Sequence, residues 1–137
     1  MASTESEVVA ANEAFYQAFA RRDLAAMDSL WAEHAPVACI HPGWDVLLGR
    51  EDVMESWRAI FANPEAPRVR CDRPNAVVQG ETAFVVCIER VGRDDLIATN
   101  TFVREDDAWR MVHHQAGPLA RRKDPSPPTP RSPHDLN

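Results

Sequence analysis

The sequence predicts an α+β fold in which a mostly antiparallel sheet packs against three helices of the N-terminal half. Three observations predict it: helical periodicity over 5–33, a strand–turn–helix unit over 37–61, and successive strand patterns over 82–117. With 137 residues, 45% of them hydrophobic, the chain can fill one core, so we expect a single domain at 1–117. The Pro-rich stretch 118–137 has no apolar period and is predicted to be a flexible tail.

Two helices are expected first. Residues 5–21 carry apolar side chains on one side at the helical period. Asp23 is a suitable N-cap for a second helix over 24–33, and Pro36 closes the helical region. The buried stripe of the second helix is predicted to contain Leu24, Met27, Leu30 and Trp31.

The unit at 37–61 is the stretch on which the functional prediction depends. A strand of alternating side chains runs into His41, a Pro-Gly turn carries Trp44, and a short strand at 46–48 leads into a helix. The apolar stripe of that helix comprises Val53, Trp57, Ile60 and Phe61. An imidazole and an indole therefore leave a strand end where a helix packs back over it, which predicts a lined pocket.

The C-terminal third reads as strands. Residues 67–79 are extended and interrupted by Pro74, which places them near a sheet edge. Residues 82–91, 95–104 and 109–117 are strands joined by tight turns.

Counting back from the two turns assigns side chains to faces, with Asn100 opposite both Val85 and His113. An unrecognised bulge would reverse part of the assignment. The first face holds Val85, Cys87, Glu89, Ala98, Asn100, Phe102, Met111, His113 and Gln115. The second holds Phe84, Val86, Ile88, Ile97, Thr99, Thr101, Val103, Val112 and His114. We assign the first face to the pocket. Because the helices are too few to cover both apolar faces, the second face is predicted to form a homodimer interface.

Composition excludes several classes of function. A net charge of −6 and a pI near 5.3 argue against nucleic acid as the main partner. No apolar run of about 18 residues is present, and the acidic N-terminus lacks a signal-peptide pattern, so neither a membrane nor secretion is expected. Three widely spaced cysteines fit neither a disulfide framework nor a zinc pattern. We therefore expect a cytoplasmic protein.

The order of these features resembles the nuclear transport factor 2-like superfamily, and within it the SnoaL-like and ketosteroid-isomerase-like branch. The resemblance covers about residues 5–117 and rests on AFARRDLAAMDSLWAEHAPV, on HPG followed by GREDVMESW, on ATNTFVRE, and on the terminal WRMVHH. It implies a cone-shaped roll, in which a curved sheet wraps around the three helices and encloses a ligand cavity, and a dimer formed through the convex sheet face. It implies little about activity, because this fold hosts enzymes and non-enzymes.

The isomerase's own catalytic trio is not retained. Its aspartate base corresponds to His41, its helix tyrosine to Phe15 with Tyr16 adjacent, and its oxyanion-hole aspartate lies near Thr99 or Asn100. Steroid isomerisation by that mechanism is therefore not expected. The last strand also resembles the association domain of a calcium/calmodulin-dependent kinase, but Asn100 stands where that domain has a pocket arginine.

His41 is the first candidate catalytic residue, as a general base, and the alternative is a partly buried histidine that bonds a neighbour and shapes the cavity. Asn100 and His113 could polarise a ligand carbonyl, or they could simply satisfy each other. Because His41 and His113 lack a third ligand, no metal is expected. Glu89 is costly to bury charged, so we expect it to pair with an arginine, Arg90 or Arg104, at the rim.

The predicted ligand-binding residues are aromatic: Tyr16, Phe19, Trp31, Trp44 and Trp57. Trp44 is the better ligand candidate, whereas Trp57 on the helix stripe also suits plain core packing. The sequence therefore predicts a small-molecule-binding protein with an enclosed, mainly apolar pocket for a small apolar or aromatic molecule. It is either an enzyme of isomerase, dehydratase or cyclase type without a cofactor, or a non-catalytic ligand-binding or dimerisation module.

Overall fold

A computed structural model describes residues 4–120 and has the predicted α+β architecture. Its helices are α1 (Thr4–Arg21), α2 (Leu24–Leu30) and α3 (Arg50–Ala62). Its strands are β1 (Ala38–Ile40), β2 (Leu47–Leu48), β3 (Arg70–Gln79), β4 (Thr82–Val91), β5 (Asp94–Glu105) and β6 (Ala108–Pro118). The strands form one sheet in the order β2-β1-β6-β5-β4-β3, in which only the β1–β6 pair is parallel.

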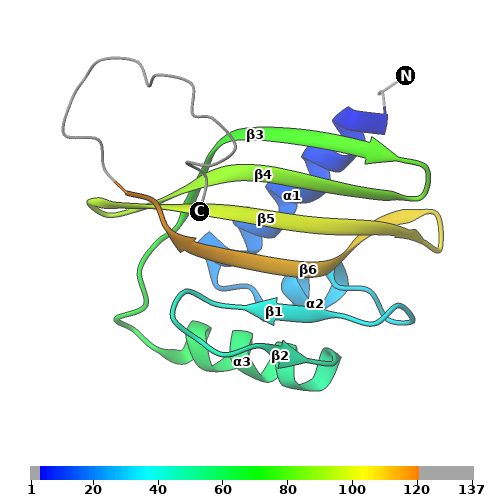
Figure 1. The fold of residues 1–137 in the computed structure, drawn as a ribbon. Helices are drawn as coiled ribbons and strands as arrows, with labels where there is room; N and C mark the ends of the chain where they lie inside the picture. The colour runs from blue at the N-terminus through cyan, green and yellow to red at the C-terminus, as the bar shows by residue number, and fades with distance from the viewer. Residues whose placement is uncertain (1–3, 121–137) are drawn as a thin grey trace, which may run out of the picture.

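All three helices lie toward one face of this curved sheet, which we call the inner face. In Figure 1 the sheet is turned to the viewer and α1 and α2 lie behind it, so no helix within residues 4–120 covers the outer face. The core fills the space between the helices and the inner face. At its centre the ring of Phe15 from α1 meets Trp57 of α3 edge-on, with the ring centroids 5.5 Å apart. None of the helices within residues 4–120 is long and apolar enough to cross a bilayer.

The second helix is shorter than predicted. Asp23 is its N-cap as expected and accepts a hydrogen bond from the Ala26 N–H at 3.0 Å. The helix ends at Leu30 because Trp31 turns to an extended backbone and bridges to Met111 of β6. A sheet contact made by a distant strand thus replaces the last helical turn of the predicted 24–33 segment.

Both predicted hairpin turns are present. Val91 pairs with Asp94, and Glu105 pairs with Ala108. The faces of β4 and β5 therefore follow the prediction, and the buried side chains of their inner face are Ala83, Val85, Cys87, Glu89, Ala98, Asn100 and Phe102.

A register shift in β6 reverses the predicted faces beyond Met111. Val112 is the extra residue, so His113 pairs with Thr101 and His114 pairs with Asn100. The shift lies where β6 leaves its bridge to Trp31 and begins to pair with β1, and a bulge is the usual way for a strand to bend at such a point. The predicted faces are therefore wrong for three side chains of β6: His113, His114 and Gln115.

One edge of the sheet is strand β3, and the described chain ends shortly after strand β6. Strand β3 is an edge strand with an irregularity around Pro74, as the prediction for 67–79 required. Strand β6 continues to Pro118, one residue beyond the predicted domain boundary, and the Leu119 N–H donates to the Asp95 carbonyl. The rest of the predicted tail, 121–137, lies outside the described residues.

Candidate functional site

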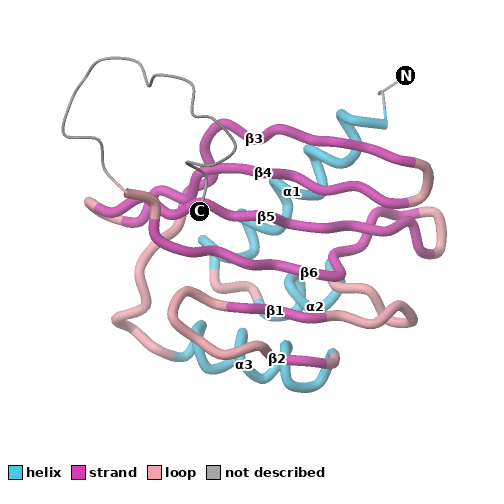
Figure 2. The backbone as a smooth tube through the Cα atoms, in the orientation of Figure 1, coloured by secondary structure: helices cyan, strands magenta, loops and turns pink. Residues whose placement is uncertain are grey.

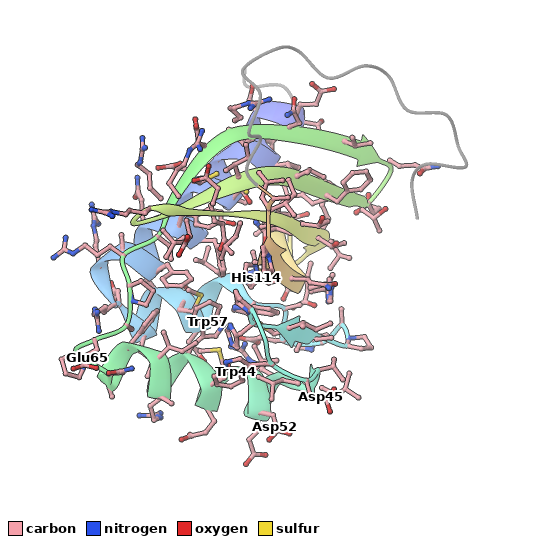
Figure 3. The ribbon with its side chains drawn as sticks, turned by 60° about the vertical axis from the view of Figure 1, so that its left-hand side comes forward. Trp44, Asp45, Asp52, Trp57, Glu65 and His114 are labelled. Atoms are coloured by element: carbon pink, nitrogen blue, oxygen red, sulfur yellow. The ribbon has the colours of Figure 1, made fainter. Side chains whose placement is uncertain are left out.

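A cavity of about 310 Å³ lies between α3, the loop that follows it and the inner face of the sheet. It is lined by Phe19, His41, Pro42, Trp44, Ile60, Asn63, Glu65, Ala66, Pro67, Val69, Glu89, Val91, Leu96 and His114. His41, Glu89 and His114 are at most 3% exposed and form its floor, whereas Trp44 is 46% exposed and marks its mouth. Figure 3 shows His114 in the interior between α3 and the sheet, and Glu65 at the periphery, beyond the end of α3.

One side of the mouth is the loop 63–69 that joins α3 to β3 (Figure 2). Arg22, just after α1, holds this loop through backbone carbonyls. Its guanidinium donates to the carbonyls of Phe61, Asn63 and Ala66, at 3.3, 2.6 and 2.7 Å. The loop is therefore fixed against α1, although it contains no helix or strand.

Glu89 is the only carboxyl side chain on the cavity floor among the described residues. Its Oε2 accepts a hydrogen bond from the Tyr16 hydroxyl at 2.7 Å. Burial raises the pKa of this carboxyl above its ordinary range, and the Tyr16 hydrogen bond opposes that rise. At neutral pH the protonated and ionised forms of Glu89 are therefore closer in free energy than those of an exposed glutamate.

The predicted arginine partners of Glu89 are engaged elsewhere, so that prediction is wrong. Arg90 points to the other side of the strand and binds Asp72 and Asp95 at 2.7 and 2.5 Å. Arg104 lies near Glu7, with 3.7 Å between their charged atoms.

Asn100 connects the floor residues. Its side-chain amide donates to Asn12 Oδ1 at 2.8 Å and to the Tyr16 hydroxyl at 3.0 Å. Its Oδ1 faces Nδ1 of His114 at 2.5 Å, and since that oxygen can only accept, Nδ1 of His114 carries the proton. Nε2 of His114 is then an unprotonated acceptor, 3.8 Å from Oε2 of Glu89. Burial, followed by the neighbouring His41 and His113, lowers the pKa of His114 to about 3, so its ring is neutral.

His41 is also neutral, and one of its two ring nitrogens is engaged in a hydrogen bond. Ser56 donates its hydroxyl hydrogen to the Val53 carbonyl, so it accepts from Nε2 of His41 at 2.9 Å. Burial lowers the pKa of His41 to about 4. The imidazole also meets the Trp44 and Trp57 rings edge-on, with centroids 4.8 Å away in each case. His41 therefore both bonds a neighbour and lines the cavity.

Comparison with known proteins identifies the family. A model of the SnoaL-like domain matches residues 8–120. The chain belongs to the SnoaL-like family. That family lies within the NTF2-like superfamily, so the resemblance found in the sequence is confirmed.

Two solved structures are similar to this SnoaL-like domain. One is a candidate dehydratase of the NTF2-like family from Streptomyces avermitilis, 34% identical, with a TM-score of 0.77 and coverage of 85% of this chain and 96% of that one. The other is a candidate calcium/calmodulin-dependent protein kinase type II association domain from Thiobacillus denitrificans, 36% identical, with a TM-score of 0.73 and coverage of 82% and 94%.

A curated relative is longer than this chain. F-box protein SKIP8 from Arabidopsis thaliana is 25% identical over 116 residues, which are 83% of this chain. The chain spans about half of that protein's length, 50%. The relationship therefore concerns the SnoaL-like domain and says little about the F-box protein as a whole.

The SnoaL-like domain places the predicted site residues in four groups. Phe19, His41 and Trp44 line the cavity. Tyr16 and Asn100 stand behind its floor and bond the floor residues. The remaining three do not line it: Trp57 and Trp31 are wholly buried in the core, and His113 lies on the outer face of the sheet.

Two floor residues of the SnoaL-like domain were not among the predicted site residues. The sequence pattern indicates that Glu89 points inward, because it follows Val85 and Cys87 on alternate positions of β4, although the cost of burying its charge predicts a rim ion pair. His114 could be found only by knowing the bulge at Val112.

Among residues 4–120, one cluster has atoms close enough to share a metal ion: His34, Glu105 and Asp106. It lies on the surface at the β5–β6 turn. The Glu105 carboxylate already accepts backbone N–H groups of residues 33–35, so the cluster anchors that segment to the turn.

Proposed function

We propose that this SnoaL-like domain binds a small, mainly apolar molecule in the cavity and acts on it by acid–base chemistry of isomerase or dehydratase type, with Glu89 moving the proton. The observation that carries the proposal is a buried carboxyl on the cavity floor that is held by a phenol and faces the lone pair of a neutral imidazole. Enzymes repeatedly use a carboxyl group whose pKa is raised by an apolar site as a general acid or base.

Glu89 suits this role better than the two catalytic residues first expected. His41 has a pKa of about 4, so it is a weak base, and its only proton is donated to Ser56. Both donor contacts of Asn100 are made within the wall, to Asn12 and Tyr16, so its amide positions the floor and does not polarise a ligand carbonyl.

The reaction that fits is a proton transfer at carbon. The Glu89 carboxylate takes a proton from a carbon beside a carbonyl, and the electron pair of the broken C–H bond passes into an enolate. The protonated Glu89 then returns the proton either to another carbon, which gives an isomer, or to a β-hydroxyl, which leaves as water while a C=C bond forms. Nε2 of His114 lies 3.8 Å from Oε2 of Glu89, so the carboxyl faces an unprotonated nitrogen. The similarity to a candidate dehydratase supports this type of chemistry.

Replacing Glu89 with glutamine tests the proposal. Glutamine can still accept from Tyr16 but cannot carry the proton, so we expect exchange at carbon to fall by about 10²–10⁴-fold. The measurement is loss of the C2 proton signal of 3-hydroxy-1-indanone, a β-hydroxy ketone, by NMR in deuterated water.

Glu81→Gln makes the same chemical change in the exposed β3–β4 turn and should leave the exchange rate unchanged. Exchange by Glu89→Gln at the wild-type rate would overturn the role of Glu89. Absence of exchange above the buffer rate in the wild-type protein would overturn the enzymatic proposal and favour a non-catalytic binding module.

A second proposal, a homodimer formed through the outer face of the sheet, rests on a row of side chains that crosses all six strands. The row runs through Leu48, Ala38, His113, Thr101, Phe84 and Val77. Leu48, Val77 and Phe84 are 67%, 48% and 40% exposed. No helix of the described residues covers the outer face in Figure 1. The similarity to a candidate association domain supports this reading.

Thr101→Arg tests the dimer. Thr101 lies in the middle of the row, so a guanidinium there would meet its own symmetry mate across a two-fold contact. We expect light scattering at micromolar concentration to give the mass of a dimer for the wild type and of a monomer for the variant. Ala59→Arg, on the exposed side of α3, is the control and should remain dimeric. A monomeric wild type would contradict the proposal.

A further inference from the structure

We propose that the molecule bound in this cavity presents a hydroxyl or N–H donor to the floor and carries no negative charge. The inference rests on the proposed function only in taking the same cavity as the binding site. It concerns the class of ligand and holds whether or not the ligand reacts.

The floor presents acceptors. When Glu89 is ionised its two oxygens only accept, and within residues 4–120 the side chain is engaged by one donor, Tyr16. Nε2 of His114 is the second acceptor, because the proton of that ring is fixed on Nδ1 by Asn100. While Glu89 is ionised, a ligand hydroxyl or N–H can bond either group, whereas an ether or carbonyl oxygen can bond neither.

Three side chains in or next to the floor use their donor hydrogens inside the wall: Tyr16, Asn100 and His41. The Tyr16 hydroxyl hydrogen goes to Glu89, and the Asn100 amide hydrogens go to Asn12 and Tyr16. The hydrogen on Nε2 of His41 goes to Ser56. Among the described residues the Trp57 indole N–H is buried without a hydrogen-bond partner, but Trp57 does not line the cavity. The lining side chains that could still donate to a ligand, Trp44 and Asn63, lie at the mouth.

The charged side chains that line the cavity also disfavour a negatively charged ligand. Two carboxyl side chains, Glu89 and Glu65, line the cavity, and no lysine or arginine of residues 4–120 does. Arg22 lies close to the mouth, but its guanidinium is turned to the carbonyls of the 61–66 segment. A carboxylate or phosphate on the ligand would therefore lose its hydration without gaining a cation. The net charge of −6 adds a repulsion at longer range.

Four probes with one two-ring body separate the possibilities: 2-naphthylmethanol, its methyl ether, 2-naphthylmethylamine and 2-naphthoate. Their binding to the full chain is measured by titration calorimetry near neutral pH. We expect the alcohol to bind at least about tenfold more tightly than the ether, and the carboxylate to bind most weakly. Comparison of the alcohol with the amine shows whether the donor is neutral or cationic.

Glu89→Gln supplies the internal check, because a glutamine that still accepts from Tyr16 turns its amide hydrogens to the cavity. The preference for the alcohol over the ether should fall to within about threefold, while Glu81→Gln should keep the wild-type preference. Equal binding of alcohol and ether by the wild type, or tightest binding of the carboxylate, would overturn the inference, as would failure of all four probes to bind at about 1 mM.

The two proposals fail separately. A clear donor preference without Glu89-dependent proton exchange leaves the ligand class standing and removes the catalysis. Proton exchange that depends on Glu89, without a preference for donor ligands, supports the catalysis and removes the ligand class.

Discussion

Acidification from neutral pH to about pH 3 should lower the free energy of unfolding by about 4 kcal/mol through His114 alone, given a pKa of about 3 in the fold. In the unfolded chain an imidazole binds a proton below about pH 6.5. In the folded protein His114 stays neutral until about pH 3, because it is buried. The unfolded state therefore binds more protons throughout this window, and stability falls as the pH falls. His41, with a pKa of about 4, adds to the loss in the same direction.

Urea unfolding followed by tryptophan fluorescence across this pH range would measure the slope. His114→Asn keeps an N–H that can reach Asn100 but does not titrate, so it should unfold more easily at neutral pH and depend less on acid. His34→Asn, at an exposed histidine of the β5–β6 end, is the control and should keep the wild-type slope. Parallel curves for the wild type and His114→Asn would contradict the assignment.

The parts of the fold that sequence reasoning predicted well are those fixed by local chemistry. Asp23 caps α2 because a carboxylate can accept from the helix N–H groups two or three residues on. The two tight turns fix the register of their hairpins, and counting from them placed Glu89 and Asn100 on the inner face. The existence of a cavity beside His41 and Trp44 also followed from the local strand–turn–helix order.

The parts that were predicted incorrectly are set by contacts between distant segments. Trp31 leaves the predicted helix because its backbone joins Met111, eighty residues away in sequence. The same contact ends where β6 turns to pair with β1, and the extra residue at Val112 moves His114 into the site. Val112 is neither glycine nor proline, so its side chain gives no sign of a bulge. One long-range pairing therefore accounts for both the shortened helix and the misplaced histidine.

Asn100→Ala is expected to cost about 3–5 kcal/mol of unfolding free energy, which is large for a single polar side chain. The change leaves Nδ1–H of His114 and Oδ1 of Asn12 buried without their partner, at about 1–3 kcal/mol each, and it also leaves a small void. Thr99→Ala, next to it on the outer face, is the matched control and should cost less than about 1 kcal/mol. Urea unfolding at neutral pH decides between these values, and a loss below 1 kcal/mol for Asn100→Ala would refute the network.

Asn100→Asp distinguishes two contributions of the Asn100 side chain: the hydrogen bonds that it makes and its effect on the pKa of His114. Aspartate still accepts from His114 but cannot donate to Asn12 or Tyr16, so stability at neutral pH should again fall. Its negative charge beside His114 should raise the pKa of that ring and so reduce the loss on acidification. Asn100→Ala has no such charge. A shallower acid slope in the aspartate variant than in the alanine variant would show that Asn100, as a neutral acceptor, keeps His114 both oriented and uncharged.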